Sequence, residues 1–207
     1  MYYDVVILPP PKIRERIGRA VRASSRGRRS VYLVDNRRLI PHVSIFHIRT
    51  SKIGIAKIAS AIERLVRVYQ PITIHSRGIS ARSSRGMWLK LSNTKTLERL
   101  HGEVVGKCKT FKTGAMPWPH PERKPSKMEA LYCKRYGSHH VLKYFKPHFT
   151  LAKFITREDV DAAAKKLRKF QCAFIADTIA LCRVDRRYQV TSILKTFRLG
   201  KKLQENN

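Results

Sequence analysis

Apolar residues follow one of two patterns along most of the chain. In the first pattern they recur at every second position or form a short run, which predicts β-strands. These segments are 3–8, 30–34, 40–48, 71–80, 86–92, 141–154, 173–183 and 188–199. In the second pattern they recur every three or four residues and predict amphipathic helices. These segments are 13–21, 55–69, 97–108 and 160–170. Asn93 is the expected N-cap of the third helix, and Thr156 with Asp159 forms the expected capping box of the fourth.

The order of these segments indicates the fold class. Most predicted strands are joined by short turns, with helices between pairs of strands, which favours an α+β fold with antiparallel sheets. Residues 112–140 follow neither pattern and are rich in Pro, Lys, Gly and His. This segment is too long for a routine connection. We interpret it as a lid, an insertion or a disordered loop within a single domain that spans 1–207.

Charge changes the picture more than size does. The chain has 207 residues, of which 43% are hydrophobic, enough for one sizeable core. Its 44 Lys and Arg outnumber 14 Asp and Glu, giving a formal net charge of +30. Residues 1–103 and 104–207 each carry half of that excess, so the charge belongs to the whole surface. A polyanionic partner is therefore expected, and chemistry based on paired carboxylates or carboxylate-bound metals has few residues available.

The cysteines and the apolar runs bear on localisation. The four cysteines form no CxxC pair, and the N-terminus lacks the charged leader and long apolar run of a signal peptide. No apolar stretch approaches the roughly 20 residues of a membrane helix. We expect a reduced, cytoplasmic protein that does not span a membrane.

One motif, Pro-His-x-Ser/Thr, occurs twice in the chain, 106 residues apart. Pro41-His42-Val43-Ser44 and Pro147-His148-Phe149-Thr150 each lie in a predicted strand that precedes an amphipathic helix. Residues i and i+2 of a strand point to one face, so each His shares a face with its hydroxyl residue. We expect one imidazole and one hydroxyl from each strand to face outward, with the intervening apolar residues facing the helices.

These segments resemble the two-histidine (2H) phosphoesterases, in the branch of 2'-5' RNA ligase-like proteins and RNA 2',3'-cyclic phosphodiesterases. The sequences that carry the resemblance are VILPPP, PHVSIF, PHFTLAKF, FIADTIALCRVD and YQVTSILKTFRLG. The resemblance implies a bilobal fold, with two pseudo-symmetric antiparallel sheets facing a central cleft and the helices outside. Ser44 replaces the commoner Thr, and Lys153 stands where RNA-acting relatives often have Arg.

The resemblance also implies roles for the motif residues. His42 would be the general acid and His148 the general base in opening a 2',3'-cyclic phosphate, and the roles would exchange in the ligating direction. Two imidazoles titrating near neutral pH suit such a pair. Ser44 and Thr150 would donate hydrogen bonds to the non-bridging phosphate oxygens. No metal and no cofactor is expected, and no protein partner is implied.

Other residues are candidates for binding the substrate. Phe46 is expected on the exposed face of His42, and Tyr144 and Phe145 are weighed equally as stacking or packing residues. Phosphate contacts are expected from basic residues: Arg28, Arg29, Arg85 and Lys153. His47 falls on the opposite strand face and is left out of the site. A zinc site made by Cys108, His120, Cys133, His139 and His140 is disfavoured because their spacing matches no common ligand pair.

Three functional hypotheses remain open. The first is a metal-independent phosphodiesterase acting on RNA that ends in a 2',3'-cyclic phosphate, or a 2'-5' ligase. The second is a catalytically silent, basic RNA-binding protein on the same fold. The third is a 2H enzyme for small cyclic nucleotides or 2'-5' oligoadenylates, which the charge of +30 disfavours because a small substrate needs few basic residues.

Overall fold

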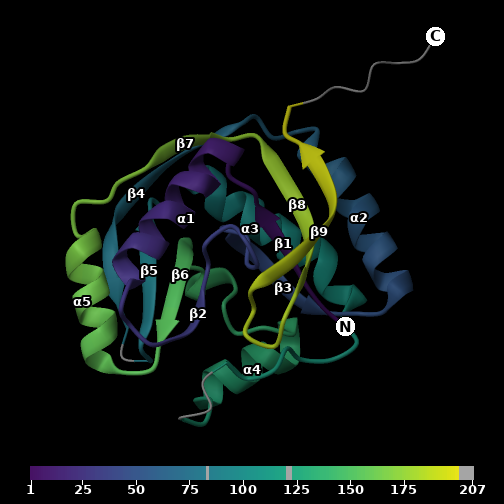
Figure 1. Cartoon of the computed structure of the whole chain (residues 1–207). Coiled ribbons are helices and arrows are strands. Elements are labelled where there is room, and N and C mark those ends of the chain that lie inside the picture. The colour runs from purple at the N-terminus through teal and green to yellow at the C-terminus, as the bar shows by residue number, and fades with distance from the viewer. Residues whose placement is uncertain (83, 120–122, 201–207) are drawn as a thin grey trace.

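The computed structural model describes residues 1–82, 84–119 and 123–200. These residues form one curled, mixed α+β structure whose strands pair in antiparallel fashion (Figure 1). The strands are β1 (Tyr2–Ile7), β2 (Ser30–Leu33), β3 (Val43–Arg49), β4 (Ile72–Ala81), β5 (Gly86–Leu91), β6 (His148–Phe154), β7 (Ala173–Ala176), β8 (Thr178–Val184) and β9 (Val190–Arg198). The helices are α1 (Pro11–Ser25), α2 (Lys52–Val66), α3 (Lys95–Cys108), α4 (Lys127–Tyr136) and α5 (Arg157–Leu167), with 3₁₀ turns η1 (Lys109–Phe111) and η2 (Leu142–Tyr144).

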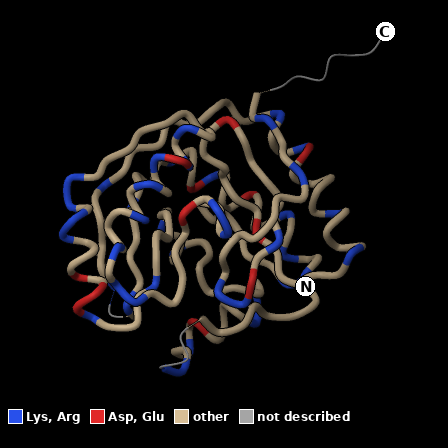
Figure 2. The backbone as a smooth tube through the Cα atoms, viewed as in Figure 1, with Lys and Arg blue, Asp and Glu red and all other residues tan. Residues whose placement is uncertain are grey.

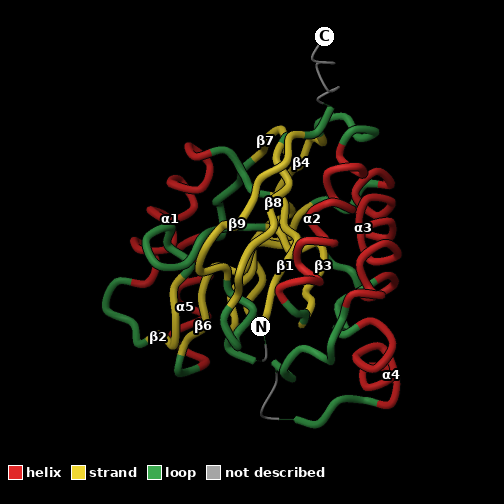
Figure 3. Tube along the Cα trace, turned by 90° about the vertical axis from the view of Figure 1, so that its right-hand side faces the viewer, coloured by secondary structure: helices red, strands yellow, loops and turns green. Residues whose placement is uncertain are grey.

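The strand order divides the sheet into two halves. It runs β7-β4-β5-β6-β3-β1-β8-β9, with β2 added at β6. The halves meet where β3 lies beside β6, and Val43 pairs with Phe149 there. Helices α1 and α5 contact the half that contains β6, whereas α2 and α3 contact the half that contains β3. Figure 3 shows these helix pairs on opposite sides of the strands. The bilobal α+β fold expected from the sequence is confirmed.

Most predicted elements are present, with informative differences at their ends. Segment 141–154 is only partly a strand, because η2 precedes it and β6 begins at His148. Segment 173–183 is interrupted at Asp177, which separates β7 from β8. The third predicted helix is capped by Thr94, whose hydroxyl accepts the Leu97 N–H, and not by Asn93. The Thr156 hydroxyl does cap α5 by accepting the Asp159 N–H.

The segment 112–140 contains a helix that the hydrophobic pattern did not reveal. Helix α4 begins with a capping box in which Ser126 and Glu129 each bond to the backbone of the other. It ends at Gly137, whose φ of 86° is the left-handed conformation that glycine favours. Few of its residues are buried, so it lacks the apolar stripe that marks the other helices.

A β-bulge in β3 determines which residues face each side. Val5 of β1 pairs with Phe46, but the next residue, Val6, pairs with Ser44. Ile45 therefore has no partner in β1, and the alternation of side chains shifts by one position. The Ile45 carbonyl accepts a hydrogen bond of 2.7 Å from His101 Nδ1. A helix side chain thus satisfies the backbone group that the bulge leaves unpaired.

His101 is held as a neutral imidazole by its two partners. Its Nδ1 donates to the Ile45 carbonyl, while its Nε2 accepts the Leu142 N–H at 2.7 Å. The ring is 1% exposed and stacks on Phe145 at 4.0 Å. Burial lowers the pKa of His101 to about 4. Protonation of Nε2 would break the bond to Leu142, which also favours the neutral form.

We predict that His101 makes stability depend on pH. The unfolded chain binds a proton at a histidine near pH 6.5, whereas folded His101 binds one only near pH 4, so stability falls as pH decreases between these values. The contribution of His101 should shrink by about 2 kcal/mol between pH 7 and pH 5. Urea unfolding of the wild type and of His101→Leu at both pH values measures it. A stability difference that does not change with pH contradicts the prediction.

Candidate functional site

A cavity of about 860 Å³ lies beside the place where the two halves of the sheet meet. Its walls come from β2, β3, β5 and β6, the turn between β8 and β9, and the segments on either side of α4. Its lining residues include Ser44, His148 and Thr150 of the repeated motifs, whereas His42, which was expected to face outward, is buried and is not among them. A cavity of this size is large enough for a nucleotide-sized ligand.

The two motifs cross in antiparallel register. Because Val43 pairs with Phe149, the neighbouring positions place Ser44 across from His148, and His42 across from Thr150. Each histidine therefore lies near the hydroxyl residue of the other motif. The intervening residues Val43 and Phe149 are fully buried in the core, as the alternation predicted.

The two histidines have the same internal hydrogen bond. His42 Nδ1 lies 2.7 Å from the Ile40 carbonyl oxygen, and His148 Nδ1 lies 2.7 Å from the Lys146 carbonyl oxygen. A carbonyl only accepts, so each Nδ1 carries a proton and each Nε2 is left for other contacts. Proline stands between acceptor and histidine in both motifs, where it restricts the preceding residue to an extended conformation. The repeated Pro-His pair thus fixes both tautomers.

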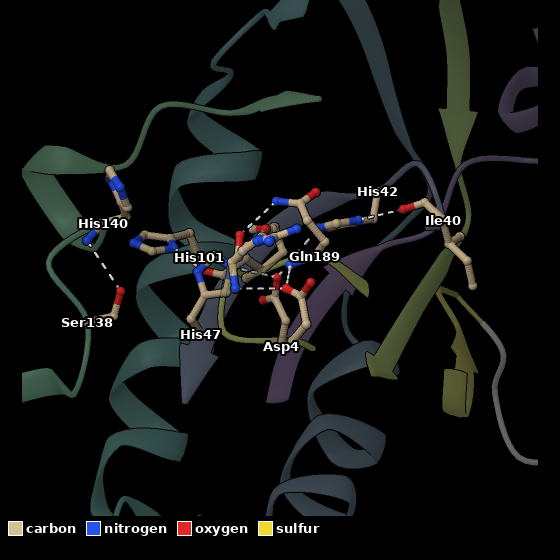
Figure 4. A network of polar contacts seen from close by, with 12 residues as sticks. Asp4, Ile40, His42, His47, His101, Ser138, His140 and Gln189 are labelled. Carbon is tan, nitrogen blue, oxygen red and sulfur yellow. Dashed lines mark hydrogen bonds and ion pairs between the residues drawn. The ribbon is translucent and has the colours of Figure 1, made fainter. Parts of the chain in front are cut away.

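The environments of the two histidines differ. His42 is 5% exposed, and its Nε2 lies 3.9 Å from the buried carboxylate of Asp4 (Figure 4). His148 is partly buried and lines the cavity. Burial lowers the pKa of His42, while the Asp4 carboxylate opposes that shift. Burial, together with the nearby His42, His47 and Arg82, lowers the pKa of His148 to about 4, while the hydrogen bond to the Lys146 carbonyl opposes that shift.

Two sequence-based predictions about β3 are wrong. Phe46 is 1% exposed and packs in the core, so it does not share the outward face of His42. His47 lines the cavity together with Ser44, although simple alternation assigned it to the opposite face. The bulge at Ile45 explains both errors, because an extra residue shifts every later side chain to the other side.

The remaining predicted binding residues divide into two groups. Tyr144, Phe145, Lys153 and Arg85 line the cavity, and Phe145 is also a packing residue because it stacks on His101. Arg28 and Arg29 are not among the lining residues. The Arg28 guanidinium instead donates to the Ser24 and Arg26 carbonyls near the end of α1. Arg28 is half-buried beyond the end of α1 and Arg29 is exposed just before β2, and neither lines the cavity.

The sequence of the chain matches the model of a known protein family. The model of the 2'-5' RNA ligase superfamily matches residues 9–187, which is most of the chain. The chain belongs to this superfamily. No curated protein sequence matches the chain significantly.

Several solved structures have a similar fold. TT0787 of Thermus thermophilus is 17% identical with a TM-score of 0.59, and the match covers 98% of this chain and 100% of that one. E. coli LigT in complex with NADP⁺ is 17% identical with a TM-score of 0.57, covering 96% and 98% of the two chains. E. coli LigT in complex with 3'-AMP is 15% identical with a TM-score of 0.54, covering 96% and 97%.

Several cavity residues of this superfamily member were not foreseen from its sequence. The indole of Trp88 stacks on His148, with ring centres 3.7 Å apart and planes 18° apart, and the Arg82 guanidinium lies 4.6 Å from the centre of the Trp88 ring. Trp88 pairs with Thr150 across β5 and β6, which sets it beside the second motif. Asp4 was overlooked, although a carboxylate in the apolar strand β1 is a signal in itself.

The segment around α4 also contributes to the cavity wall. Trp118, His139 and His140 line it, and the Arg123 guanidinium lies 4.9 Å over the Trp118 ring while pairing with Glu129 at 2.7 Å.

Of the disfavoured zinc ligands, His120 lies outside the described residues and Cys108 is buried in the core. No group of three described His, Cys, Asp or Glu side chains is placed to hold a metal ion. No described helix is long and apolar enough to cross a membrane.

We predict that Trp88 fluorescence reports the charge of His148. Trp118→Phe leaves Trp88 as the sole tryptophan, and a stacked imidazolium quenches indole more strongly than imidazole does. With a His148 pKa of about 4, the ring stays neutral and the emission stays constant from pH 8 to pH 5. The same variant carrying His148→Gln is the control. A fluorescence step centred near pH 6.5 that the control lacks would contradict the prediction.

Proposed function

We propose that the protein is a metal-independent phosphodiesterase that opens the 2',3'-cyclic phosphate at the end of an RNA chain. The observation that carries this proposal is the matched pair of Nδ1 hydrogen bonds at His42 and His148. It gives two imidazoles of the same tautomer, on strands that cross in antiparallel register. General acid–base catalysis at phosphorus needs one such group on each side of the reacting atom.

Electrostatics favour a division of roles between the two histidines. Burial lowers the pKa of His42, but the Asp4 carboxylate near its Nε2 opposes that shift, and a carboxylate beside the imidazole suits the acid. The charged groups that act on His148 are His42, His47 and Arg82, all of which favour its neutral form. His148 Nε2 would therefore take a proton from water as its oxygen attacks phosphorus. His42 would give a proton to the ribose oxygen as its bond to phosphorus breaks.

The hydroxyls of Ser44 and Thr150 would stabilise the phosphate during this step. Both residues line the cavity and lie on the crossing strands. Negative charge on the non-bridging oxygens rises in the transition state, and neutral donors already in place bind it without reorganisation. The same groups would form a 2'-5' bond if a 5'-hydroxyl replaced water: His148 would take the proton of that hydroxyl as its oxygen attacks phosphorus, and His42 would protonate the departing 3' oxygen. Cleavage of the 2'-5' bond back to the cyclic phosphate would exchange the two roles.

We predict that turnover requires both histidines. The assay is hydrolysis of a short RNA ending in a 2',3'-cyclic phosphate, with a chelator present, by the wild type, His42→Ala and His148→Ala. Each substitution should lower the rate by about 10²–10⁴-fold and leave RNA affinity largely unchanged. His75→Ala is the matched control, because His75 is exposed on β4 and does not line the cavity. RNA binding without turnover by folded wild-type protein would favour the silent RNA-binding hypothesis.

A small nucleotide is the second candidate substrate, and salt separates it from RNA. Solved LigT structures contain NADP⁺, ATP and 3'-AMP, so the superfamily fold holds small nucleotides. Here, however, exposed basic residues line several sides of the cavity: Arg82, Arg85, Lys146, Arg186 and Arg187. Figure 2 shows Lys and Arg on both halves of the molecule as well. This distribution suits a chain of phosphates better than a single nucleotide.

We predict a steep salt dependence for RNA binding. With about five phosphate contacts, the logarithm of the association constant of a ten-nucleotide RNA should fall with the logarithm of salt concentration at a slope of about −3.5. Substituting both Arg186 and Arg187 by Ala should make that slope shallower by about 1.4. Fluorescence anisotropy with an RNA ending in a 3'-phosphate measures it, with 3'-AMP as competitor. Equal slopes for RNA and 3'-AMP would favour the small-nucleotide substrate.

A further inference from the structure

A third histidine, His47, contacts both a buried carboxylate and one of the motif hydroxyls. His47 Nε2 is 3.0 Å from Asp4 Oδ2 (Figure 4), and it is 3.2 Å from Ser44 Oγ. Asp4 is fully buried and His47 is 7% exposed, with its ring against Tyr188 at 4.6 Å. Neither Asp4 nor His47 belongs to the repeated motif. The bulge in β3 brings His47 to the side of Ser44.

The two contacts of His47 Nε2 determine where its proton lies. A carboxylate oxygen only accepts, so a bare Nε2 lone pair 3.0 Å away would be repelled by it. Nε2 must therefore carry a proton, whether the imidazole is neutral or cationic. A protonated Nε2 cannot accept the Ser44 proton. At 3.2 Å, the Ser44 hydroxyl oxygen can only receive from Nε2.

This arrangement fixes the direction in which Ser44 donates. A hydroxyl has one proton and two lone pairs, and one lone pair of Ser44 faces His47. Its own proton is then free to point away from His47, and Ser44 lines the cavity. Without His47, the hydroxyl could rotate and donate elsewhere, so that a bound phosphate would have to reorient it first.

We propose that His47, anchored by Asp4, is a positioning residue that orients the Ser44 hydroxyl as a hydrogen-bond donor toward a phosphate oxygen in the cavity. The proposal rests on the proposed function for its phosphate ligand. The tautomer of His47 can be tested without any reaction.

The first test is the protonation of His47. Nitrogen-15 spectra of the imidazoles, assigned with single His→Gln variants, should show a proton on Nε2 of His47 at pH 7.5. His42 and His148 should both show a proton on Nδ1, and the His148 ring should be neutral. A neutral His47 with a bare Nε2 would overturn the proposal. Because these spectra need no substrate, they remain decisive even if no RNA is turned over.

The second test is whether His47 acts through Ser44. Four variants are compared with the wild type: Ser44→Ala, His47→Leu, His47→Gln and the double variant Ser44→Ala/His47→Leu. Loss of one oxyanion donor typically lowers kcat by 10²–10³-fold, and we expect Ser44→Ala near the lower end. His47→Leu should lower kcat by about tenfold with little change in KM. His47→Gln should recover most of that loss, because its amide N–H can replace Nε2–H.

The double variant separates positioning from other roles. If His47 acts through Ser44, adding His47→Leu to Ser44→Ala lowers kcat no further. Fully multiplicative losses would overturn the proposal, and so would a His47→Leu loss as large as that of His148→Ala, which would make His47 itself an acid or base. A purely structural role for His47 would also overturn the proposal. In that case His47→Leu and His47→Gln would have equally lowered melting temperatures, and their kcat values would equal each other.

The same five proteins are also titrated with inorganic phosphate. The dissociation constant should be higher in His47→Leu than in the wild type, but no higher in the double variant than in Ser44→Ala. This keeps the failure of the positioning proposal distinct from the failure of the phosphodiesterase proposal. If the wild type does not turn over RNA, but Ser44 and His47 are still coupled in phosphate binding, only the phosphodiesterase proposal is rejected.

Discussion

The halves of the sheet meet at the pairing of Val43 with Phe149, and the rest of the site depends on how these two strands cross. Both residues are fully buried, so the crossing is fixed by the hydrophobic core and not by the polar groups around it. The antiparallel register then gives each histidine the hydroxyl of the other motif as its neighbour. A slip by one residue would turn all four side chains into the core, which makes the register as important as the residues themselves.

The protonation of the site follows from a few fixed acceptors. Backbone carbonyls of Ile40 and Lys146 hold protons on Nδ1 of the motif histidines, and the Asp4 carboxylate, 3.0 Å from Nε2 of His47, favours a proton on that nitrogen. In a chain with a net charge of +30, this one fully buried carboxylate acts on two imidazoles at once. The Asp4 carboxylate lies near His42 and not near His148, so the two motif histidines have different electrostatic environments. A general acid and a general base need such a difference, because one must be protonated while the other is neutral.

The sequence was informative where structure is local. Alternating apolar residues located most strands, and the repeated Pro-His segments pointed to two residues that the fold brings to the same crossing. Contacts between distant residues were not predictable in this way. The Ile45 carbonyl at the bulge accepts a hydrogen bond from His101, which lies 56 positions later in the chain. Because simple alternation does not include the bulge, it assigned Phe46 and His47 to the wrong faces of the strand. Helix α4 did have a local signal, Ser126 followed by Glu129, but its lack of an apolar stripe concealed it.

The central claim is that a phosphate binds where the two motif strands cross. A crystal structure of the protein with 3'-AMP tests this claim most directly. The account predicts that the phosphate oxygens lie within hydrogen-bond distance of Ser44 Oγ, Thr150 Oγ1 and His148 Nε2, with His42 Nε2 on the opposite side of the phosphorus. A phosphate bound by Arg186 and Arg187 at the edge of the cavity, with both motifs unoccupied, would contradict it.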